Sequence, residues 1–179
     1  PVDGADHAPV TESPRAGAPA ARLPSSLRLA LLAALVVGVS VAAFVPTLSA
    51  GFVNWDDDVN FTTNLGFRGL GPAQLRWMFT TTLLGHWIPL TWLTLGANYA
   101  VGGMDPWGYH LVNVLVHAAA AGAFFLVARR LLAAVLAGPP VAVDLGAAVA
   151  ALACGAHPLR VESVAWITER RDVLCALFY

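Results

Sequence analysis

The sequence predicts an all-α integral membrane protein whose helices cross the bilayer several times. Of its 179 residues, 58% are hydrophobic and only 12% are charged, which departs far from the average soluble domain. The mean hydropathy is +0.67. The hydrophobic residues also gather into long segments without charge, and about 20 such residues suffice to cross the hydrocarbon core of a bilayer.

Charge and cysteine content exclude several other classes. The net charge is −1 and all ten basic residues are arginine. The sequence therefore offers no basic field for nucleic acid and no lysine for Schiff-base chemistry. The two cysteines, Cys154 and Cys175, lie in apolar stretches and form no CxxC pair, so neither a disulfide framework nor a zinc site is predicted.

The chain is expected to begin with a disordered cytoplasmic tail over residues 1–27, which are rich in proline, glycine and alanine. Residues 28–50 form the first predicted transmembrane helix, since no charged residue follows Arg28 in this segment. Residues 48–50 resemble a signal-peptidase site, but the apolar core of a signal peptide runs only about 7–15 residues. An uncleaved membrane anchor is the favoured interpretation.

Residues 51–106 form a predicted extracytoplasmic loop that contains interfacial helices. The stretch from Pro72 to Leu84 is amphipathic and opens on a proline, which suits a first helical position. The apolar stretch from Trp87 to Val101 is only about 15 residues long, too short to span a bilayer comfortably. We predict an interfacial or re-entrant helix there.

The remaining elements alternate across the membrane. They are a second transmembrane helix over 107–132, a cytoplasmic loop over 133–141, a third helix over 142–156, an extracytoplasmic segment over 157–172 and a fourth helix that starts in 173–179. Arginines precede the first helix and end the second, and cytoplasmic flanks are enriched in arginine. The loop and the segment 157–172 are therefore predicted to share the extracytoplasmic side.

The acidic triplet Asp56, Asp57 and Asp58 is the first candidate for chemistry. Three adjacent carboxylates repel one another, so such a cluster suits a cation, an arginine or an acceptor hydroxyl whose proton a general base removes. The alternative is a solvated acidic turn that caps a helix. The sequence leaves both interpretations open.

The segment 157–172 is the second candidate. If it is helical throughout, Glu162, Trp166 and Glu169 share one face, with Arg170 beside them. Arginine suits bidentate recognition of phosphate, and tryptophan offers a flat surface to a sugar ring. An ordinary interfacial belt of aromatic residues and arginines explains the same pattern, and this alternative also stays open.

Polar residues mark the second predicted transmembrane helix, where His110, Asn113 and His117 lie on one face. Such residues usually face the interior of a helix bundle. Two histidines need a third ligand from elsewhere to bind a metal, so we favour hydrogen-bonded packing residues. The triplet Asn60-Phe61-Thr62 matches the N-glycosylation acceptor pattern, which arises often by chance.

A series of motifs in a fixed order carries a more specific resemblance. It comprises Asn54-Trp55-Asp56-Asp57-Asp58, Trp77-Met78-Phe79-Thr80, His86-Trp87-Ile88-Pro89-Leu90, Pro106-Trp107-Gly108-Tyr109-His110, His157-Pro158-Leu159-Arg160-Val161-Glu162 and Glu169-Arg170-Arg171-Asp172. From about Phe52 to Tyr179 the chain resembles the membrane region of bacterial tetratricopeptide-repeat membrane proteins. Those proteins resemble the transmembrane and tetratricopeptide-repeat O-mannosyltransferases. We expect the chain to be the N-terminal part of a longer protein.

This resemblance implies the architecture of the GT-C glycosyltransferases: many transmembrane helices, an acidic first extracytoplasmic loop and a polyprenyl-phosphate sugar donor. It implies catalytic roles for Asp56 and Asp57, and the extra carboxylate Asp58 leaves the catalytic member ambiguous. It implies substrate binding by a second set of residues, namely Asp58, His86, Arg160, Glu162, Glu169 and Arg170. A divalent cation stays open, because Asp56, Asp57 and Glu162 would suit Mg²⁺ or Mn²⁺ while some members of the class work without metal.

The predicted function is a membrane glycosyltransferase, similar to a protein O-mannosyltransferase, in a bacterial inner membrane with a cytoplasmic N-terminus. A hydroxyl of a protein or other acceptor would attack the lipid-linked sugar on the extracytoplasmic side. The chain shows no ~34-residue repeat and is expected to be inactive alone. The alternatives are a noncatalytic membrane scaffold that anchors tetratricopeptide repeats and a transporter. Convergence of Asp57 and Glu162 on one cavity would favour the enzyme, and a polar path through His117 would favour the transporter.

Overall fold

The computed structural model describes residues 23–179, so most of the predicted tail over 1–27 lies outside the described residues. Within 23–179 all regular elements are helices, apart from an isolated bridge between Leu83 and His86. Two helical segments, Ser25–Ser49 and Pro106–Val135, are long and apolar enough to cross a bilayer. A third crossing results if Pro140–Gly155 and Pro158–Ala165, which meet at a bend of 51°, are counted together. The prediction of an all-α membrane protein is confirmed.

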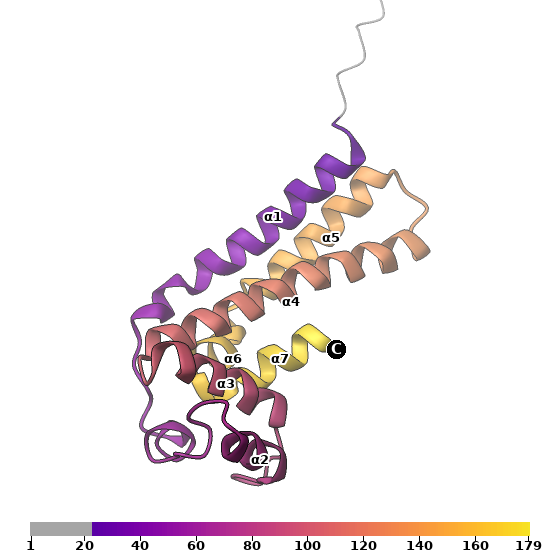
Figure 1. Cartoon of the computed structure of the whole chain (residues 1–179). Helices are drawn as coiled ribbons and strands as arrows, with labels where there is room; N and C mark the ends of the chain where they lie inside the picture. The colour runs from indigo at the N-terminus through magenta and orange to yellow at the C-terminus, as the bar shows by residue number, and fades with distance from the viewer. Residues whose placement is uncertain (1–22) are drawn as a thin grey trace, which may run out of the picture.

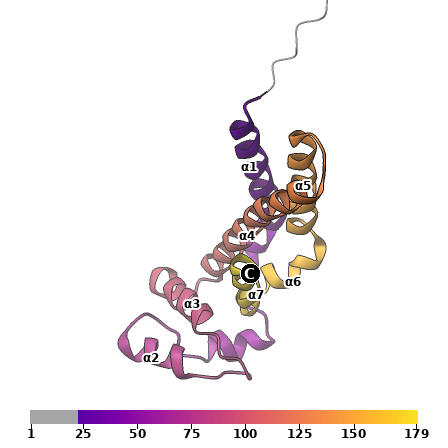
Figure 2. The same ribbon diagram turned by 90° about the vertical axis from the view of Figure 1, so that its right-hand side faces the viewer.

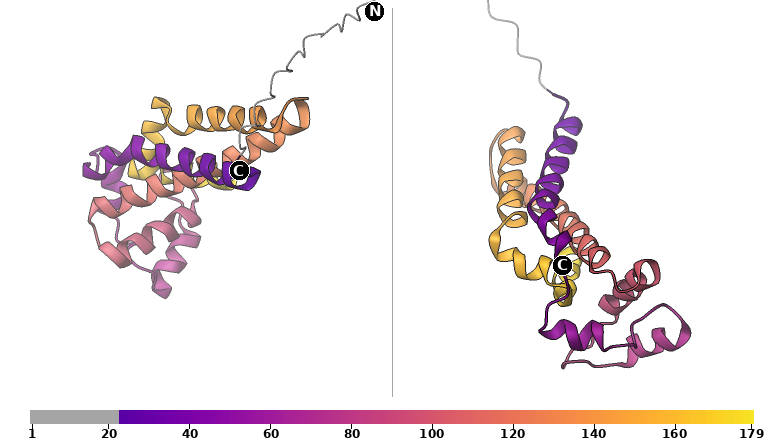
Figure 3. Two further views of the ribbon diagram at one scale, coloured as in Figure 1. Left: turned by 90° about the horizontal axis from the view of Figure 1, so that it is seen from above. Right: turned by 90° about the vertical axis from the view of Figure 1, so that its left-hand side faces the viewer.

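Three long helices lie side by side: α1 (Ser25–Phe44), α4 (Pro106–Val135) and α5 (Pro140–Gly155) (Figures 1 and 3). A 3₁₀ turn, η1 (Val45–Ser49), extends α1. The core between the three helices is built mainly of small residues: Val36, Ala121, Phe125, Ala128, Ala147, Ala148 and Ala151. Small side chains let helix backbones approach closely. The resulting van der Waals packing stabilises helix association inside a bilayer, where the hydrophobic effect does not act between helices.

An ion-paired cluster joins these helices near the start of α1. Asp144 of α5 is fully buried, and its Oδ2 accepts hydrogen bonds from Arg28 Nε (2.9 Å) and Nη2 (2.7 Å). Its Oδ1 accepts from Arg129 Nε of α4 at 2.7 Å. Two arginines that the sequence indicates as cytoplasmic flanks therefore also bind one carboxylate shared by three helices.

The segment between α1 and α4 folds into short helices that gather beyond the N-terminus of α4 (Figures 1 and 2). These are η2 (Asp58–Thr62), α2 (Pro72–Thr80) and α3 (Pro89–Gly102). Both α2 and α3 begin on a proline, whose fixed φ suits the first helical position. Their core is aromatic and large: Phe61, Phe67, Met78, Trp92, Leu95, Tyr109 and Ile167.

The last segment is not one continuous helix, contrary to the arrangement considered from the sequence. It consists of η3 (Pro158–Arg160), α6 (Val161–Ala165), η4 (Ile167–Glu169) and α7 (Arg170–Phe178), which packs against α4. Trp166 has extended backbone (φ −86°, ψ 119°) and separates α6 from η4. As a result Glu162 is exposed while Glu169 is buried, so the two carboxylates do not share a face.

Candidate functional site

The acidic loop after α1 meets the segment around η4 through a buried hydrogen bond. Asp57 is fully buried, and its Oδ1 accepts from the hydroxyl of Thr168 at 2.6 Å. Its Oδ2 accepts from the backbone N–H of Val53 at 2.9 Å. The Thr168 hydroxyl also accepts from Asn60 Nδ2 at 3.2 Å. Two polar segments that are distant in sequence are thus tied together at one end of the molecule.

The three aspartates differ in how their oxygens are engaged. Both oxygens of Asp57 accept hydrogen bonds from the protein. Asp58 is half-buried, and its Oδ1 accepts from the backbone N–H of Val59 at 2.8 Å. Asp56 is half-buried and its carboxylate makes no hydrogen bond within residues 23–179. Asp56 is therefore the member of the triplet that is most available to a ligand.

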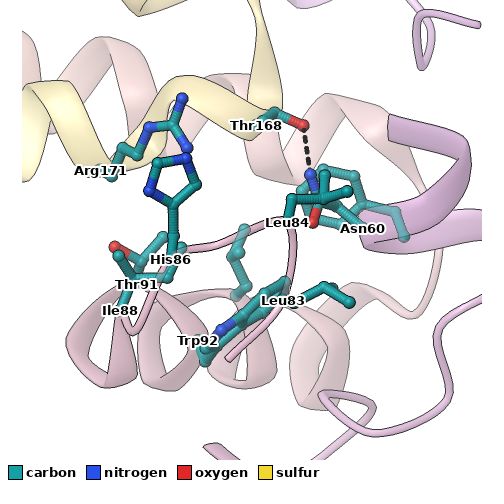
Figure 4. A pocket seen from close by; sticks show the side chains of 11 residues that line it. Asn60, Leu83, Leu84, His86, Ile88, Thr91, Trp92, Thr168 and Arg171 are labelled. Carbon is teal, nitrogen blue, oxygen red and sulfur yellow. Dashed lines mark hydrogen bonds between the residues drawn. The ribbon is translucent and has the colours of Figure 1, made fainter. Parts of the chain in front are cut away.

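A small pocket lies next to this link and carries two basic side chains (Figure 4). His86 and Arg171 lie on one side, and Asn60 and Thr168 with their hydrogen bond lie on the other. The pocket volume of about 10 Å³ is room for roughly one water molecule. The hydrogen-bond chain to Asp57 thus starts in the wall of a pocket whose far side carries His86 and Arg171.

His86 reaches this pocket from a tight turn. The backbone of Leu83 and His86 exchanges two hydrogen bonds, and the two residues between them, Leu84 and Gly85, have φ of 49° and 80°. Positive φ suits glycine but is uncommon and strained for a leucine side chain. Strained backbone often occurs at functional sites. The strain at Leu84 therefore supports the choice of this pocket as part of a candidate site.

A larger apolar groove of about 490 Å³ adjoins the pocket, between the start of α3 and α7. Its lining residues are Trp87, Ile88, Pro89, Leu90, Thr91, Arg171, Asp172, Leu174, Cys175 and Phe178. Arg171, Ile88 and Thr91 line both cavities. Arg171 therefore lies where the small pocket and the apolar groove adjoin.

Arg170, which the sequence suggests as a substrate-binding residue, is instead engaged by the protein itself. Its side chain is fully buried, with Nε donating to Asn113 Oδ1 (2.8 Å) and Nη2 to the carbonyl oxygen of Tyr109 (2.7 Å). Its Nη1 donates to the side chain of Asn98. Burial lowers the pKa of Arg170 to about 9, so it remains charged at neutral pH. We correct its role to a structural one, because each nitrogen is already paired.

The neighbouring Arg171, which the sequence motif contains without a predicted role, lines both the pocket and the groove. The helical spacing of α7 distinguishes the two arginines. Val173 and Leu174, which are buried, follow Arg170 by three and four residues, so Arg170 lies on the same buried face. Arg171 lies three residues before the buried Leu174 and four before the exposed Cys175, so it falls at the edge of that face and is half-buried. Its guanidinium pairs with Glu169, with Nε donating to Oε2 at 3.1 Å. Burial raises the pKa of Glu169, and the positive charge of Arg171 opposes that shift.

The other predicted site residues lie apart from this pocket. Glu162 is exposed on α6, and neither it nor any of the three aspartates lines the pocket or the groove. The convergence of Asp57 and Glu162 on one cavity, which would favour an enzyme, is therefore not seen in residues 23–179. Arg160 is also exposed, and its Nη2 donates to Cys154 Sγ at 3.3 Å. Of the residues expected to bind substrate, the structure brings His86 and Glu169 close to the pocket.

The polar stripe on α4 faces the interior and mostly satisfies its own hydrogen bonds. Asn113 Nδ2 donates to the carbonyl oxygens of Val164 (3.2 Å) and Trp166 (3.4 Å). His117 Nε2 lies 2.7 Å from the carbonyl oxygen of Gly155. His110 is different, since neither ring nitrogen has a hydrogen-bond partner in the described part of the chain. Asn60, the asparagine of the glycosylation pattern, is buried and bonded to Thr168.

The donor set does not fit a metal held by this chain alone. Both oxygens of Asp57 are occupied by protein donors, and Glu162 lies away from the triplet. Over residues 23–179 no group of three or more histidine, cysteine, aspartate or glutamate side chains is arranged to hold a metal ion. We therefore derive no chemical step through a metal.

Comparisons with known proteins agree on one family. The chain is 38% identical over 155 residues to protein O-mannosyl-transferase Tmtc1 of Drosophila melanogaster. This match covers 80% of the chain and 17% of the relative. It is 35% identical over 149 residues to protein O-mannosyl-transferase TMTC2 of Mus musculus, covering 79% of this chain and 17% of the relative. For protein O-mannosyl-transferase TMTC4 of Homo sapiens the identity is 32% over 176 residues, 88% of this chain and 23% of the relative.

Other comparisons give no match. No protein-family model matches the sequence, and no solved structure matches the fold. The chain spans about a sixth to a quarter of the length of the curated relatives. Over about four fifths of its own length, then, this helical membrane chain is homologous to a segment of the TMTC protein O-mannosyl-transferases.

Proposed function

We propose that the full-length protein is a GT-C glycosyltransferase that transfers mannose from a polyprenyl-phosphate donor to a hydroxyl of a protein acceptor. The relatives are named protein O-mannosyl-transferases, which supports the reaction class. One structural observation carries the proposal at the level of residues. The Asp57–Thr168 hydrogen bond holds the acidic loop against the segment that bears Arg171.

The donor would lie along the groove beside α7, with its phosphate at Arg171. The groove is lined mainly by apolar side chains, which suits a prenyl chain, and Arg171 lies where the groove meets the small pocket. Arginine binds phosphate oxygens with two parallel hydrogen bonds. To do so, Arg171 would exchange part of its pairing with Glu169 for the phosphate.

The acceptor hydroxyl would be activated by Asp56, whose carboxylate is free within the described chain. Its oxygen forms a bond to the anomeric carbon of mannose while its proton passes to Asp56. The bond between the anomeric carbon and the phosphate oxygen breaks, and the lipid phosphate leaves with the electron pair. Arg171 stabilises the negative charge that develops on this phosphate.

The reaction is assigned to the extracytoplasmic side, with the N-terminus in the cytoplasm. In support of this orientation, Arg28, Arg129 and the exposed Arg130 all lie at the end of the helix bundle opposite the acidic loop. Arginine-rich flanks remain in the cytoplasm. We propose that the remainder of the full-length protein carries tetratricopeptide repeats that engage the acceptor.

The test is transfer of radiolabelled mannose from polyprenyl phosphate by membranes that carry the full-length protein at matched expression. Asp56→Asn should reduce transfer by about 100-fold or more, as expected for loss of a general base, without lowering the melting temperature. Asp57→Asn should reduce transfer and also destabilise the protein, because a buried acceptor pair is disturbed.

Asp105→Asn is the matched control. Asp105 caps α4 by accepting from the backbone N–H of Trp107 at 3.1 Å, and asparagine caps helices equally well. This variant should transfer at the wild-type rate. Wild-type transfer by all three variants would overturn the roles of Asp56 and Asp57. No transfer above empty membranes for several sugars, even by the wild type, would instead favour a noncatalytic scaffold.

A further inference from the structure

We infer that Thr168 is a positioning residue for this reaction, whose hydroxyl holds the acidic loop in place relative to the pocket of His86 and Arg171. The inference rests on the proposed function. It adds a residue that neither the sequence motifs nor the names of the relatives point to. Its basis is the set of hydrogen bonds made by Val53, Asp57 and Asn60, which flank Asp56 in the acidic loop.

The acidic loop is held by its flanking residues rather than by Asp56 itself. The Thr168 hydroxyl donates to Asp57 Oδ1 at 2.6 Å and accepts from Asn60 Nδ2 at 3.2 Å. All three side chains are buried, with exposed fractions of 0% for Asp57, 7% for Asn60 and 5% for Thr168. The Thr168 hydroxyl therefore donates one hydrogen bond and accepts another, and both hold residues 57–60, which directly follow Asp56.

The other side of the link is fixed to the helices. Two residues after Thr168, the guanidinium of Arg170 donates to Asn98 of α3 and to Asn113 and the Tyr109 carbonyl of α4. One residue further, Arg171 lines the pocket that Thr168 also lines. The segment from Thr168 to Arg171 is therefore fixed to two helices. The hydrogen bond from the Thr168 hydroxyl to Asp57 fixes the acidic loop relative to that segment.

The chemistry of the link requires a hydroxyl at this position. An O–H donor to a carboxylate forms a short, charge-assisted bond, and within residues 23–179 no basic side chain donates a hydrogen bond to the buried Asp57. Valine has nearly the shape of threonine but no hydroxyl, so it would leave Asp57 Oδ1 and Asn60 Nδ2 buried without a partner. Serine keeps the hydroxyl and loses only a methyl group.

The experiment compares wild type, Thr168→Val and Thr168→Ser in the full-length protein, with Thr94→Val as the control. The hydroxyl of Thr94 donates to the carbonyl oxygen of Thr91 in its own helix at 2.8 Å and joins no second segment. Mannose transfer is measured over a range of donor concentrations to separate kcat from KM. Hydrogen exchange of the Val53 amide, which donates to Asp57, is measured on the same proteins.

We expect Thr168→Val to lower kcat by about 10- to 100-fold, the range for a reacting group misplaced by roughly 1 Å. KM for the donor should stay within about twofold, since Arg171 and the groove are untouched, and exchange at Val53 should become faster. Thr168→Ser should recover most of the kcat, and Thr94→Val should match the wild type.

The outcomes separate the two proposals. No transfer by the wild type would overturn the proposed function, and with it the catalytic meaning of Thr168. Transfer by the wild type that Thr168→Val leaves unchanged would overturn the role of Thr168 alone. The role of Thr168 is also overturned if KM rises as much as kcat falls, or if serine fails to restore transfer, because both results indicate general damage to the fold.

Discussion

At the scale of single residues, Arg170 and Arg171 show how helical phase separates a structural arginine from one that can bind a ligand. The two are adjacent in sequence and chemically identical. Arg170 lies on the buried face of α7 and is paired at each nitrogen. Arg171 lies at the junction of the pocket and the groove. Residue type alone predicts phosphate binding for either, and burial decides between them.

Replacing each arginine by methionine tests this division. Arg170→Met should destabilise the protein by about 3 kcal/mol, because several buried acceptors lose a charged donor. Arg171→Met should change stability by less than about 1 kcal/mol, as expected for a partly exposed ion pair, while it abolishes mannose transfer. Thermal melting in detergent and the transfer assay measure the two effects. A large loss of stability for Arg171→Met would contradict the assignment.

Glu169 gives a prediction for pH. Burial raises the pKa of this carboxyl above its ordinary value of 4.5, so the folded protein binds the proton more tightly than the unfolded chain. The resulting stabilisation is fully present below pH 4.5 and is lost as the pH rises through the raised pKa. Glutamine resembles the protonated form. The melting temperature of the wild type relative to Glu169→Gln should therefore fall as the pH increases, and a difference that is independent of pH would contradict this.

At the scale of elements, close helix contacts depend on glycine. A Cβ built on Gly155, at the end of α5, would lie 2.6 Å from Ser40 Oγ of α1 and 2.9 Å from the Cβ of Ala121 in α4. A Cβ on Gly146, in the same helix, would meet only Leu132 Cδ1 at an ordinary 3.6 Å. The composition of the segment predicts a helix in both places but not which glycine is needed.

These two glycines form a matched pair for mutation. Gly155→Ala should cost about 2 kcal/mol, since an extra methyl group overpacks the contact between three helices. Gly146→Ala should be neutral or stabilise by up to about 1 kcal/mol, because alanine is the better helix former. Thermal melting of the two variants measures the difference. Equal melting temperatures would show that α5 can shift to admit the methyl group.

At the scale of the whole molecule, two sets of buried polar contacts join elements that Figure 1 shows at opposite ends of the helix bundle. At one end Asp144 binds Arg28 and Arg129, joining α1, α4 and α5. At the other end the contacts of Asp57, Thr168 and Arg170 join the loop to α3 and α4. The first set maintains the bundle, and the second also borders the proposed site.

Removing the shared carboxylate should therefore weaken the bundle. Asp144→Ala leaves two arginines without their partner and should cost about 3–5 kcal/mol, as expected when one member of a buried ion pair is removed. Arg130→Gln, which changes an exposed residue beside Arg129, should cost less than about 0.5 kcal/mol. Melting of the purified variants provides the measurement, and equal losses for the two would refute a special role for Asp144.

The sequence by itself determined the class of this protein, its helical segments in the membrane and the polar segments in which chemistry is expected. Those properties follow from composition and local periodicity, which act on neighbouring residues along the chain. Only the tertiary structure decided which polar residues are structural. Asp57 and Thr168 are 111 residues apart, yet they share a hydrogen bond. Whether a buried polar group is free for a ligand depends on which donors and acceptors surround it in space, and that information is absent from any local pattern.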